Sequence, residues 1–209
     1  MAMPAQGETF VLKGASESDI KVIQDLLDSY RGKPWFDPSF GAGKAVAWES
    51  GDCTSGIEID LSSEGVIRMK SIYEGDAKRT AIIFYEKEDR RNLLTQLVLM
   101  LSGFRIADAD FEDLMPVLEK GCKFKCFEAD KDYLSQRIVA GIKDEIRSLG
   151  SKRIKLLIQF CDLDPLSWRD FDPKMDDVEI TDVVSQWVSK DEDEDKGLIA
   201  VFCANADEG

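Results

Sequence analysis

The sequence predicts an α+β or α/β fold, in which an N-terminal helix and an antiparallel meander of about four strands precede a half where strands and helices alternate. Three observations predict this class. Residues 16–30 have the apolar spacing of an amphipathic helix, two runs of alternating apolar and polar residues meet near Gly65, and residues 154–160 and 197–203 are apolar almost throughout. Alternating runs indicate half-buried strands, and continuous apolar runs indicate strands covered on both faces.

The 209 residues are enough for one domain of ordinary size or for two small ones. The pattern changes near residue 103. This divides the chain into residues 1–103, with the helix and the meander, and residues 104–209, an acidic alternating α/β half. The alternative is one domain in which both halves share a single sheet.

The first half opens with a well-marked helix. Ser16 is a suitable N-cap, and the acid Asp19 stands three residues later, which is the spacing of a capping box. Gly32 and Pro34 are expected to end the helix. The side chains expected on its buried face are Ile20, Ile23, Leu27 and Tyr30.

A β-hairpin is predicted around Gly65. One register brings apolar side chains together on one face and pairs acids with bases on the other, and it leaves a three-residue loop, Ser63 to Gly65. The predicted pairs are Leu61 with Ile67, Ile59 with Met69, Asp60 with Arg68, and Glu58 with Lys70. Further apolar runs extend the meander over residues 44–86, and a helix over residues 87–103 follows.

The second half is expected to alternate between strands and helices. The helix at residues 130–150 has the clearest pattern, with an apolar stripe and a closing Gly150. The stripe consists of Leu134, Ile138, Ile142, Ile146 and Leu149. The other predicted elements are a strand at residues 122–127, a strand at 154–160, a helix at 176–190 and a strand at 197–203.

Residues 107–121 contain four closely spaced acids, Asp108, Asp110, Glu112 and Asp113. A helix capped at Asp110 would hold Pro116 in its interior, at a cost of about 3 kcal/mol. We therefore expect a turn over residues 108–114, then a short helix with Pro116 in its first turn, closed by Gly121. The helix dipole stabilises acids at such an entrance, so a structural role is expected, with a catalytic or metal-binding cluster as the alternative.

The stretch "LSGFRIADADFEDLMPVLEKG", residues 101–121, resembles the end of the central helix and the synergy loop of FtsZ, the tubulin-like cell-division GTPase. Asp110 and Asp113 match the acids that this family presents to the next subunit. The predicted order of strands and helices after residue 121 is also similar to that of the family's C-terminal domain. The resemblance covers at most half of the chain, and it implies a filament-associated protein with an FtsZ-like C-terminal half.

Charge restricts the class of partner. The chain has 27 basic and 41 acidic residues, a net charge of −14. Residues 105–209 hold 15 basic and 25 acidic residues, a balance of −10, so most of the excess lies in the second half. A field of this sign repels phosphate backbones and anionic lipids, so neither nucleic acid nor a membrane is expected as a partner. The chain has no apolar run of the ~20 residues that a membrane-spanning helix needs and no signal-peptide pattern, which predicts a soluble cytoplasmic protein.

The sequence has no histidine and five cysteines. The missing histidine removes the most common general base and the most common transition-metal ligand, so binding is more expected than catalysis. In a strand, Cys122 and Cys126 would face one side as small, reduced core residues, with no metal or cofactor bound. The basic run at residues 152–155 is expected to guard the start of a strand.

The loop "CDLDPLSWRDFDPKMDD", residues 161–177, is the strongest candidate for a functional surface. It follows an apolar strand, and loops at the carboxyl ends of sheet strands commonly carry binding sites. Aromatic residues surrounded by acids suit a basic protein surface, and the structural alternative is a loop packed over the sheet edge. The candidate partner-binding residues are Asp162, Asp164, Trp168, Asp170, Phe171 and Asp172.

These observations favour a non-catalytic interaction protein of the immunity, inhibitor or adaptor type, which binds a basic protein through its acidic half. The alternative from another class is a carboxylate-dependent, Mg²⁺-assisted enzyme that uses Asp108, Asp110 and Asp113, or the acids of residues 162–172. Strong stabilisation by divalent ions would favour the enzyme, since a merely acidic surface binds such ions weakly. The sequence leaves open the identity of the partner and the oligomeric state.

Overall fold

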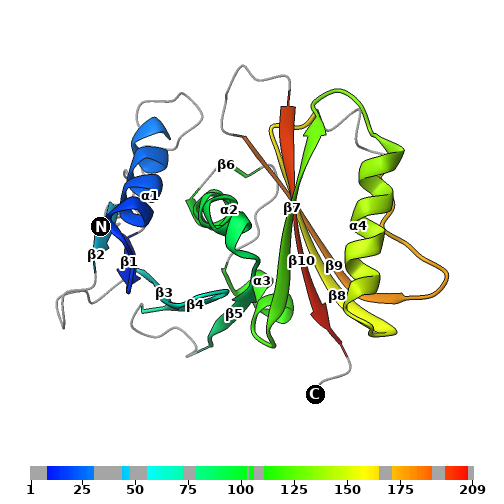
Figure 1. Cartoon of the computed structure of the whole chain (residues 1–209), viewed down its shortest axis with the longest axis horizontal. Helices are drawn as coiled ribbons and strands as arrows, with labels where there is room; N and C mark the ends of the chain where they lie inside the picture. Colours follow the sequence, from blue (N-terminus) through cyan, green and yellow to red (C-terminus); the bar gives the residue numbers. More distant parts are fainter. Residues whose placement is uncertain are drawn as a thin grey trace, which may run out of the picture.

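A computed structural model describes residues 9–30, 44–47, 56–72, 79–102, 104–105, 111–164, 171–189 and 196–206. Its helices are α1 (Glu17–Tyr30), the short 3-10 helix η2 (Lys87–Asp89), α2 (Arg90–Ser102), α3 (Phe111–Leu118) and α4 (Gln136–Ser148) (Figure 1). Its strands are β1 (Thr9–Lys13), β2 (Lys44–Ala47), β3 (Ile57–Ser63), β4 (Val66–Ser71), β5 (Ala81–Phe84), β6 (Phe104–Arg105), β7 (Cys122–Asp130), β8 (Arg153–Cys161), β9 (Glu179–Ser189) and β10 (Lys196–Asn205).

The described strands form one mixed sheet, in the order β2-β1-β3-β4-β5-β7-β10-β8-β9-β6. Strands β3, β4 and β5 form an antiparallel meander, and β10 lies antiparallel between β7 and β8. Parallel pairing joins β1 to β2 and β3, β5 to β7, and β8 to β9. The predicted class, a mixed α/β protein with a helix near its N-terminus, is confirmed.

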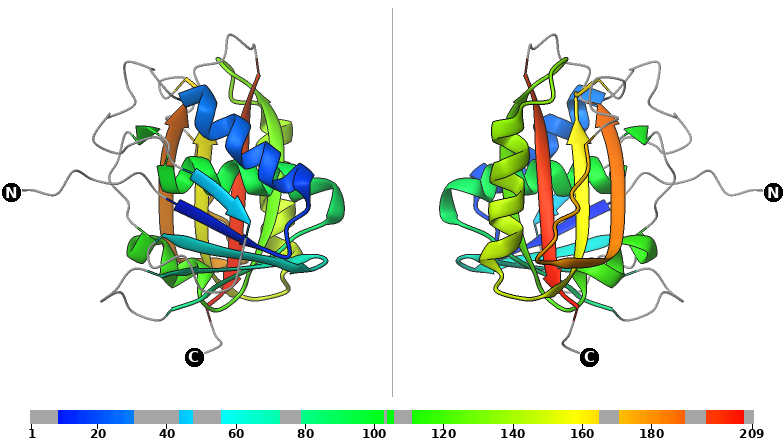
Figure 2. Two further views of the ribbon diagram at one scale, coloured as in Figure 1. Left: turned by 90° about the vertical axis from the view of Figure 1, so that its left-hand side faces the viewer. Right: turned by 90° about the vertical axis from the view of Figure 1, so that its right-hand side faces the viewer.

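The strands of the sheet form two parts that run in different directions, an N-terminal wing (β3 to β5) and a C-terminal wing (β7 to β10). In Figure 1 strands β3 to β5 run roughly from side to side, and β7 to β10 run roughly from top to bottom. Helices α2 and α3 lie in the angle between these two sets of strands. Figure 2 shows α4 against the opposite face of the C-terminal wing. The wings meet where β5 and β7 share two residue pairs, Ile83 with Cys122 and Phe84 with Lys123. The halves predicted on either side of residue 103 therefore contribute to one sheet.

Two apolar cores follow from this arrangement. The larger core lies between the wings and takes side chains from α1, α2, α3 and strands of both wings. The smaller core lies between α4 and the outer face of the C-terminal wing. Alternate residues of β8 and β10 enter the two cores, so both strands are apolar on both faces, as predicted for residues 154–160 and 197–203. Helix α2 is enclosed almost all round, which buries Leu93, Leu94, Leu97, Val98 and Leu99.

The predicted start of α1 is confirmed in its hydrogen bonds. The backbone N–H of Asp19 donates to Ser16 Oγ at 3.2 Å, and the backbone N–H of Ser16 donates to Asp19 Oδ2 at 2.9 Å. These reciprocal bonds satisfy two donors that a helix start would otherwise leave without partners. Ile23 and Leu27 are buried in the larger core, as the apolar stripe predicted.

The hairpin register is confirmed at three of its four predicted pairs. Ile59 pairs with Met69, Asp60 with Arg68, and Glu58 with Lys70. The fourth pair is displaced by a bulge between Asp60 and Ser63, after which Ser63 pairs with Val66. A bulge places an extra residue in one of two paired strands, and this increases the local twist of the sheet. Gly65 has the predicted left-handed conformation, with φ 76°.

The antiparallel meander contains three strands rather than the predicted four. Strand β2 is parallel to β1 and lies at the edge of the sheet, while β1 separates it from β3. The short run at residues 9–13 gave no period that distinguishes strand from loop, so β1 was missing from the prediction. Its residues Phe10 and Leu12 are nevertheless fully buried in the larger core.

The predicted strand and apolar stripe are confirmed for residues 122–150, but the helix begins at Gln136 rather than at residue 130, because β7 continues to Asp130. Residues Cys122, Phe124 and Cys126 of β7 all face the larger core, which confirms the packing role predicted for the two thiols. Ile142 and Ile146 of α4 are fully buried, and Leu134, Ile138 and Leu149 pack around them. Gly150 follows α4 with φ 69°, the left-handed conformation expected after a helix end.

The helix predicted at residues 176–190 is wrong, because residues 179–189 form strand β9, parallel to β8. Its first six residues include Ile180, Thr181, Val183 and Val184, whose β-branched side chains favour strands. Pairing also satisfies the backbone groups along an edge of β8 that would otherwise be open. After residue 121 the chain therefore runs β7-α4-β8-β9-β10, which differs from the alternation expected from the FtsZ resemblance.

The position predicted for Pro116 is also wrong. Helix α3 begins at Phe111, so Pro116 lies inside the helix rather than in its first turn. The neighbouring side chains of Leu114, Met115, Val117 and Leu118 are fully buried. Burial of one such side chain contributes about 1.5–3 kcal/mol, so four of them outweigh the ~3 kcal/mol cost of an interior proline. Helix α3 ends at Leu118, three residues before the predicted Gly121, which follows the turn with φ 88°.

We expect Gly14→Ala to lower the free energy of unfolding by about 2–3 kcal/mol in urea titrations. Gly14 connects β1 to α1 with φ 65°, and an added Cβ would lie 2.8 Å from the Cα of Ser62. Gly150→Ala is the matched control, because Gly150 has φ 69° but nothing within 4 Å of an added Cβ. That control should show the backbone strain alone, about 1 kcal/mol. Equal losses in the two variants would contradict a steric role for Ser62.

Candidate interaction surface

Two of the candidate residues, Asp162 and Asp164, are not part of an exposed acidic surface. Asp162 directly follows β8 with φ 54° and is 8% exposed, and Cys161 Sγ donates a hydrogen bond to its Oδ2 at 3.5 Å. The backbone N–H of Asp164 donates to the carbonyl oxygen of Lys131 at 3.0 Å, which ties this segment to the turn before α4. Both residues therefore shape the start of the loop, and the Asp162 carboxylate faces inward.

Phe171 also packs inward. Its ring lies edge-on to that of Phe160, with centroids 5.7 Å apart and an interplanar angle of 77°. This geometry is favourable for aromatic pairs, and Phe171 belongs to the smaller core. Asp172 is exposed next to it, and its Oδ1 accepts a hydrogen bond from the Lys174 backbone N–H at 3.0 Å. The candidates Trp168 and Asp170 lie outside the described residues.

The segment after Phe171 carries exposed acids that the sequence interpretation did not select. Residues 162–182 hold eight acidic and two basic residues, a balance of −6 within the −10 of the second half. The exposed acids of the described segment are Asp172, Asp176, Asp177, Glu179 and Asp182, which we call the acidic strip. The strip runs from the loop onto the first residues of β9. Asp172 was among the predicted partner-binding residues, whereas Asp176, Asp177, Glu179 and Asp182 were not, and residues 176–190 were interpreted as a helix.

Part of the acidic strip is already paired with cations of the same chain. Arg147 Nε lies 2.9 Å from Asp177 Oδ2, Arg153 Nε lies 3.2 Å from Glu179 Oε2, and Lys155 Nζ lies 3.7 Å from Asp182 Oδ2. The hydrogen bond from Arg147 lowers the pKa of Asp177. The pairs of Arg147 and Arg153 are exposed and that of Lys155 is partly exposed, so each contributes at most ~1 kcal/mol and is screened by salt. A cationic partner can therefore compete for the same carboxylates.

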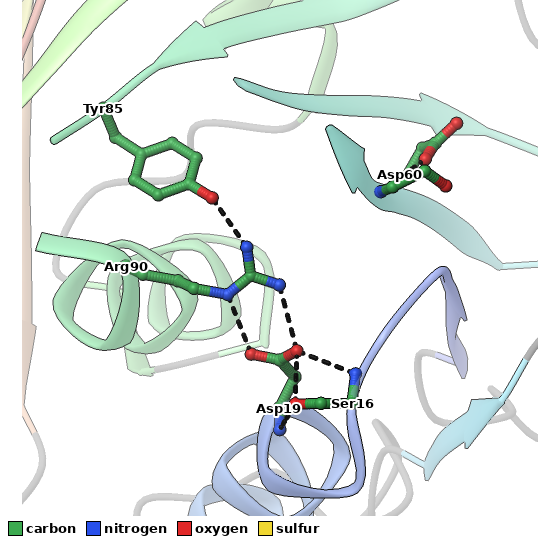
Figure 3. A network of polar contacts seen from close by, with 6 residues as sticks. Ser16, Asp19, Asp60, Tyr85 and Arg90 are labelled. Atoms are coloured by element: carbon green, nitrogen blue, oxygen red, sulfur yellow. Dashed lines mark hydrogen bonds and ion pairs between the residues drawn. The ribbon is translucent and has the colours of Figure 1, made fainter. Parts of the chain in front are cut away.

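A partly buried ion pair lies elsewhere, where α1 and α2 begin (Figure 3). Arg90 binds the Asp19 carboxylate with Nε and Nη2, each at 3.0 Å, and its Nη1 donates to the Tyr85 hydroxyl at 2.6 Å. Ser16 Oγ donates to Asp19 Oδ2 at 2.8 Å. Burial alone would raise the pKa of Asp19, but the hydrogen bonds from Arg90 and Ser16 lower it to about 2.

A second ion-pair cluster involves two acids that shortly precede Arg90 in the sequence. Lys125 of β7 binds both of them, in and next to η2. Lys125 Nζ lies 2.5 Å from Glu86 Oε2 and 3.0 Å from Asp89 Oδ2, and these hydrogen bonds raise the pKa of the ammonium group. Both clusters join elements that are distant in sequence. A carboxylate with a pKa near 2 is a poor general base, since efficient bases have a pKa near the working pH. We interpret the Asp19 cluster as structural.

The described thiols are packing groups. The thiols of Cys122, Cys126, Cys161 and Cys203 are not in disulfides, and burial raises the pKa of Cys122 and brings that of Cys203 to about 12. Thiols with such a raised pKa are poor nucleophiles. In the part of the chain that the structure describes, no three His, Cys, Asp or Glu residues are grouped so that they could hold a metal ion. Asp108 and Asp110 lie outside that part, as do the side chains of Glu112 and Asp113.

The sequence matches no protein-family model, and no curated protein is significantly similar to it. None of the helices in the described ranges is long and apolar enough to cross a membrane.

Proposed function

We propose that this protein is a non-catalytic interaction module whose acidic C-terminal half binds a basic protein partner, as an immunity protein, inhibitor or adaptor does. The observation that carries the proposal is the acidic strip, Asp172, Asp176, Asp177, Glu179 and Asp182, whose side chains are all exposed. Three of these carboxylates form ion pairs with Arg147, Arg153 and Lys155 that salt screens, so a cationic partner can compete for them. The −10 balance of the second half attracts partners of the opposite charge and speeds their association.

The packing of the strip supports this proposal. Phe171, Met175 and Val178 anchor the segment against the smaller core while the acids between them face solvent. The carboxylates are thus held on a supported surface, which lowers the entropy cost of ordering them on binding. This support also changes the expected role of Phe171. It positions Asp172 rather than inserting into a partner.

The test is a comparison of three baits on native cytosolic extract, eluted with a salt gradient and identified by mass spectrometry. The baits are the wild-type protein, Asp172→Asn/Asp176→Asn, and the control Asp25→Asn/Asp28→Asn. The control removes the same charge from exposed positions of α1. We expect the wild type and the control to retain one stoichiometric basic protein that the strip variant loses or releases at lower salt.

Two results would contradict the proposal. Equal weakening by both variants would mean that only the overall charge of −14 attracts cations, without a defined surface. Retention of the same protein by the strip variant at unchanged salt would place the binding surface elsewhere. Circular dichroism of each bait shows whether it is folded before the comparison is made.

A further inference from the structure

The outer edge of β9 is a second feature of the acidic surface. Strand β9 pairs with β8 from Glu179 to Val188, whereas β6 pairs with it at Val188 and Ser189. No other described strand pairs with this edge between residues 179 and 187. Figure 2 shows β9, in orange, at the margin of the C-terminal wing. The register of β9 against β8 shifts at Thr181, so the edge offers regularly spaced backbone donors and acceptors from Asp182 to Trp187, over about 20 Å of strand.

The side chains along this edge are also accessible. Thr181, Asp182, Val183 and Ser185 are exposed, and Val183, at 48%, is one of the few large apolar side chains of the described chain that is exposed. An exposed edge strand with an accessible apolar side chain is a template for pairing with another extended chain. Backbone bonds then provide affinity, and alternate side chains provide specificity.

Charge indicates which extended chain would pair. Glu179 and Asp182 lie on β9 itself, and Asp176 and Asp177 precede it. A second copy of this protein would bring like charges together across the edge, which is destabilising for strand pairs and is a device that prevents self-association. A segment rich in lysine or arginine would instead bring opposite charges together. Charge complementarity therefore favours a basic partner over a second copy.

We propose that β9 binds an extended basic segment of the partner as an additional strand of the sheet, with Glu179 and Asp182 contacting its cations. This inference rests on the proposed function, because it specifies how the basic partner is held. It adds a requirement that charge attraction alone does not have. The bound segment must present free backbone N–H groups.

The test compares two peptides of equal charge. The first is a short peptide of alternating lysine and valine, and the second has the same sequence with a methyl group on every backbone nitrogen. Calorimetry gives the two affinities, and hydrogen exchange with mass spectrometry reports protection of the protein's amides. We expect the methylated peptide to bind at least about tenfold more weakly, because several backbone hydrogen bonds are lost. The unmethylated peptide should slow exchange in residues 180–186.

A pair of protein variants locates the contact. Glu179→Gln/Asp182→Asn should weaken binding of the unmethylated peptide about fivefold, and Asp25→Asn/Asp28→Asn less than about twofold, as expected for exposed ion pairs. Equal affinity of the two peptides would overturn strand pairing and leave the charge-based function intact. Binding of neither peptide, or protection away from β9, would also overturn strand pairing. The bait comparison with Asp172→Asn/Asp176→Asn decides separately whether the proposed function holds.

Discussion

Arg90→Ala is expected to lower the free energy of unfolding at neutral pH by about 3–5 kcal/mol, one of the largest effects of any single substitution in this chain. Arg90 satisfies both oxygens of Asp19, whose side chain is only 11% exposed, and its removal leaves that carboxylate buried without its counterion. Urea titration measures the loss. Arg153→Ala is the control, since the pair with Glu179 is exposed and should contribute less than ~1 kcal/mol.

The pH dependence identifies the cause of that loss. In the folded wild type the pKa of Asp19 is lowered from 3.8 to about 2, so its ionisation adds stability above pH 3.8, and this stability is lost as pH falls toward 2. The shift corresponds to about 2 kcal/mol. Without Arg90, burial should raise the pKa of Asp19, so the difference between variant and wild type should shrink as the pH is lowered. A difference that is the same at pH 7 and pH 3 would contradict this assignment.

The sequence predicted those elements whose signals are local. The bonds between Ser16 and Asp19 span three residues, and the hairpin pairs around Gly65 are close along the chain, so spacing alone defines them. The pair of Arg90 with Asp19 spans 71 residues, and no local pattern indicates it. The same holds for β1, whose two partners are set by the order of strands in the sheet.

The errors have a common physical cause, which is tertiary packing that overrides a local preference. Pro116 disfavours a helix interior, yet α3 continues through it because its neighbours are fully buried. Residues 179–189 have spacing that also suits a helix, yet the free edge of β8 pairs with them as a strand. For the candidate surface, acidic composition was visible in the sequence. The sequence did not show which of these acids face solvent. Asp162 is buried and Asp172 is exposed, although both are aspartates in the same acidic segment.

Gln96→Met/Gln159→Met is expected to raise the free energy of unfolding by about 2–6 kcal/mol. Gln96 of α2 and Gln159 of β8 are fully buried, and among the described residues neither side-chain amide has a hydrogen-bond partner for its nitrogen or its oxygen. An unsatisfied buried polar group costs about 1–3 kcal/mol, and methionine fills nearly the same volume without that cost. Thermal and urea unfolding of both single variants and the double variant measure the gain.

The control for this experiment is Gln136→Met, because Gln136 is exposed at the start of α4 and its amide is solvated in both states. That substitution should change stability by less than ~0.5 kcal/mol. A stability loss in Gln96→Met or Gln159→Met would mean that the replaced amide is hydrogen-bonded in solution. Both glutamines are fully buried, whereas the acidic strip is exposed, so the stabilised double variant should retain the same basic partner as the wild type. It would then provide a background in which Arg90→Ala remains folded and its partner binding can be measured apart from its loss of stability.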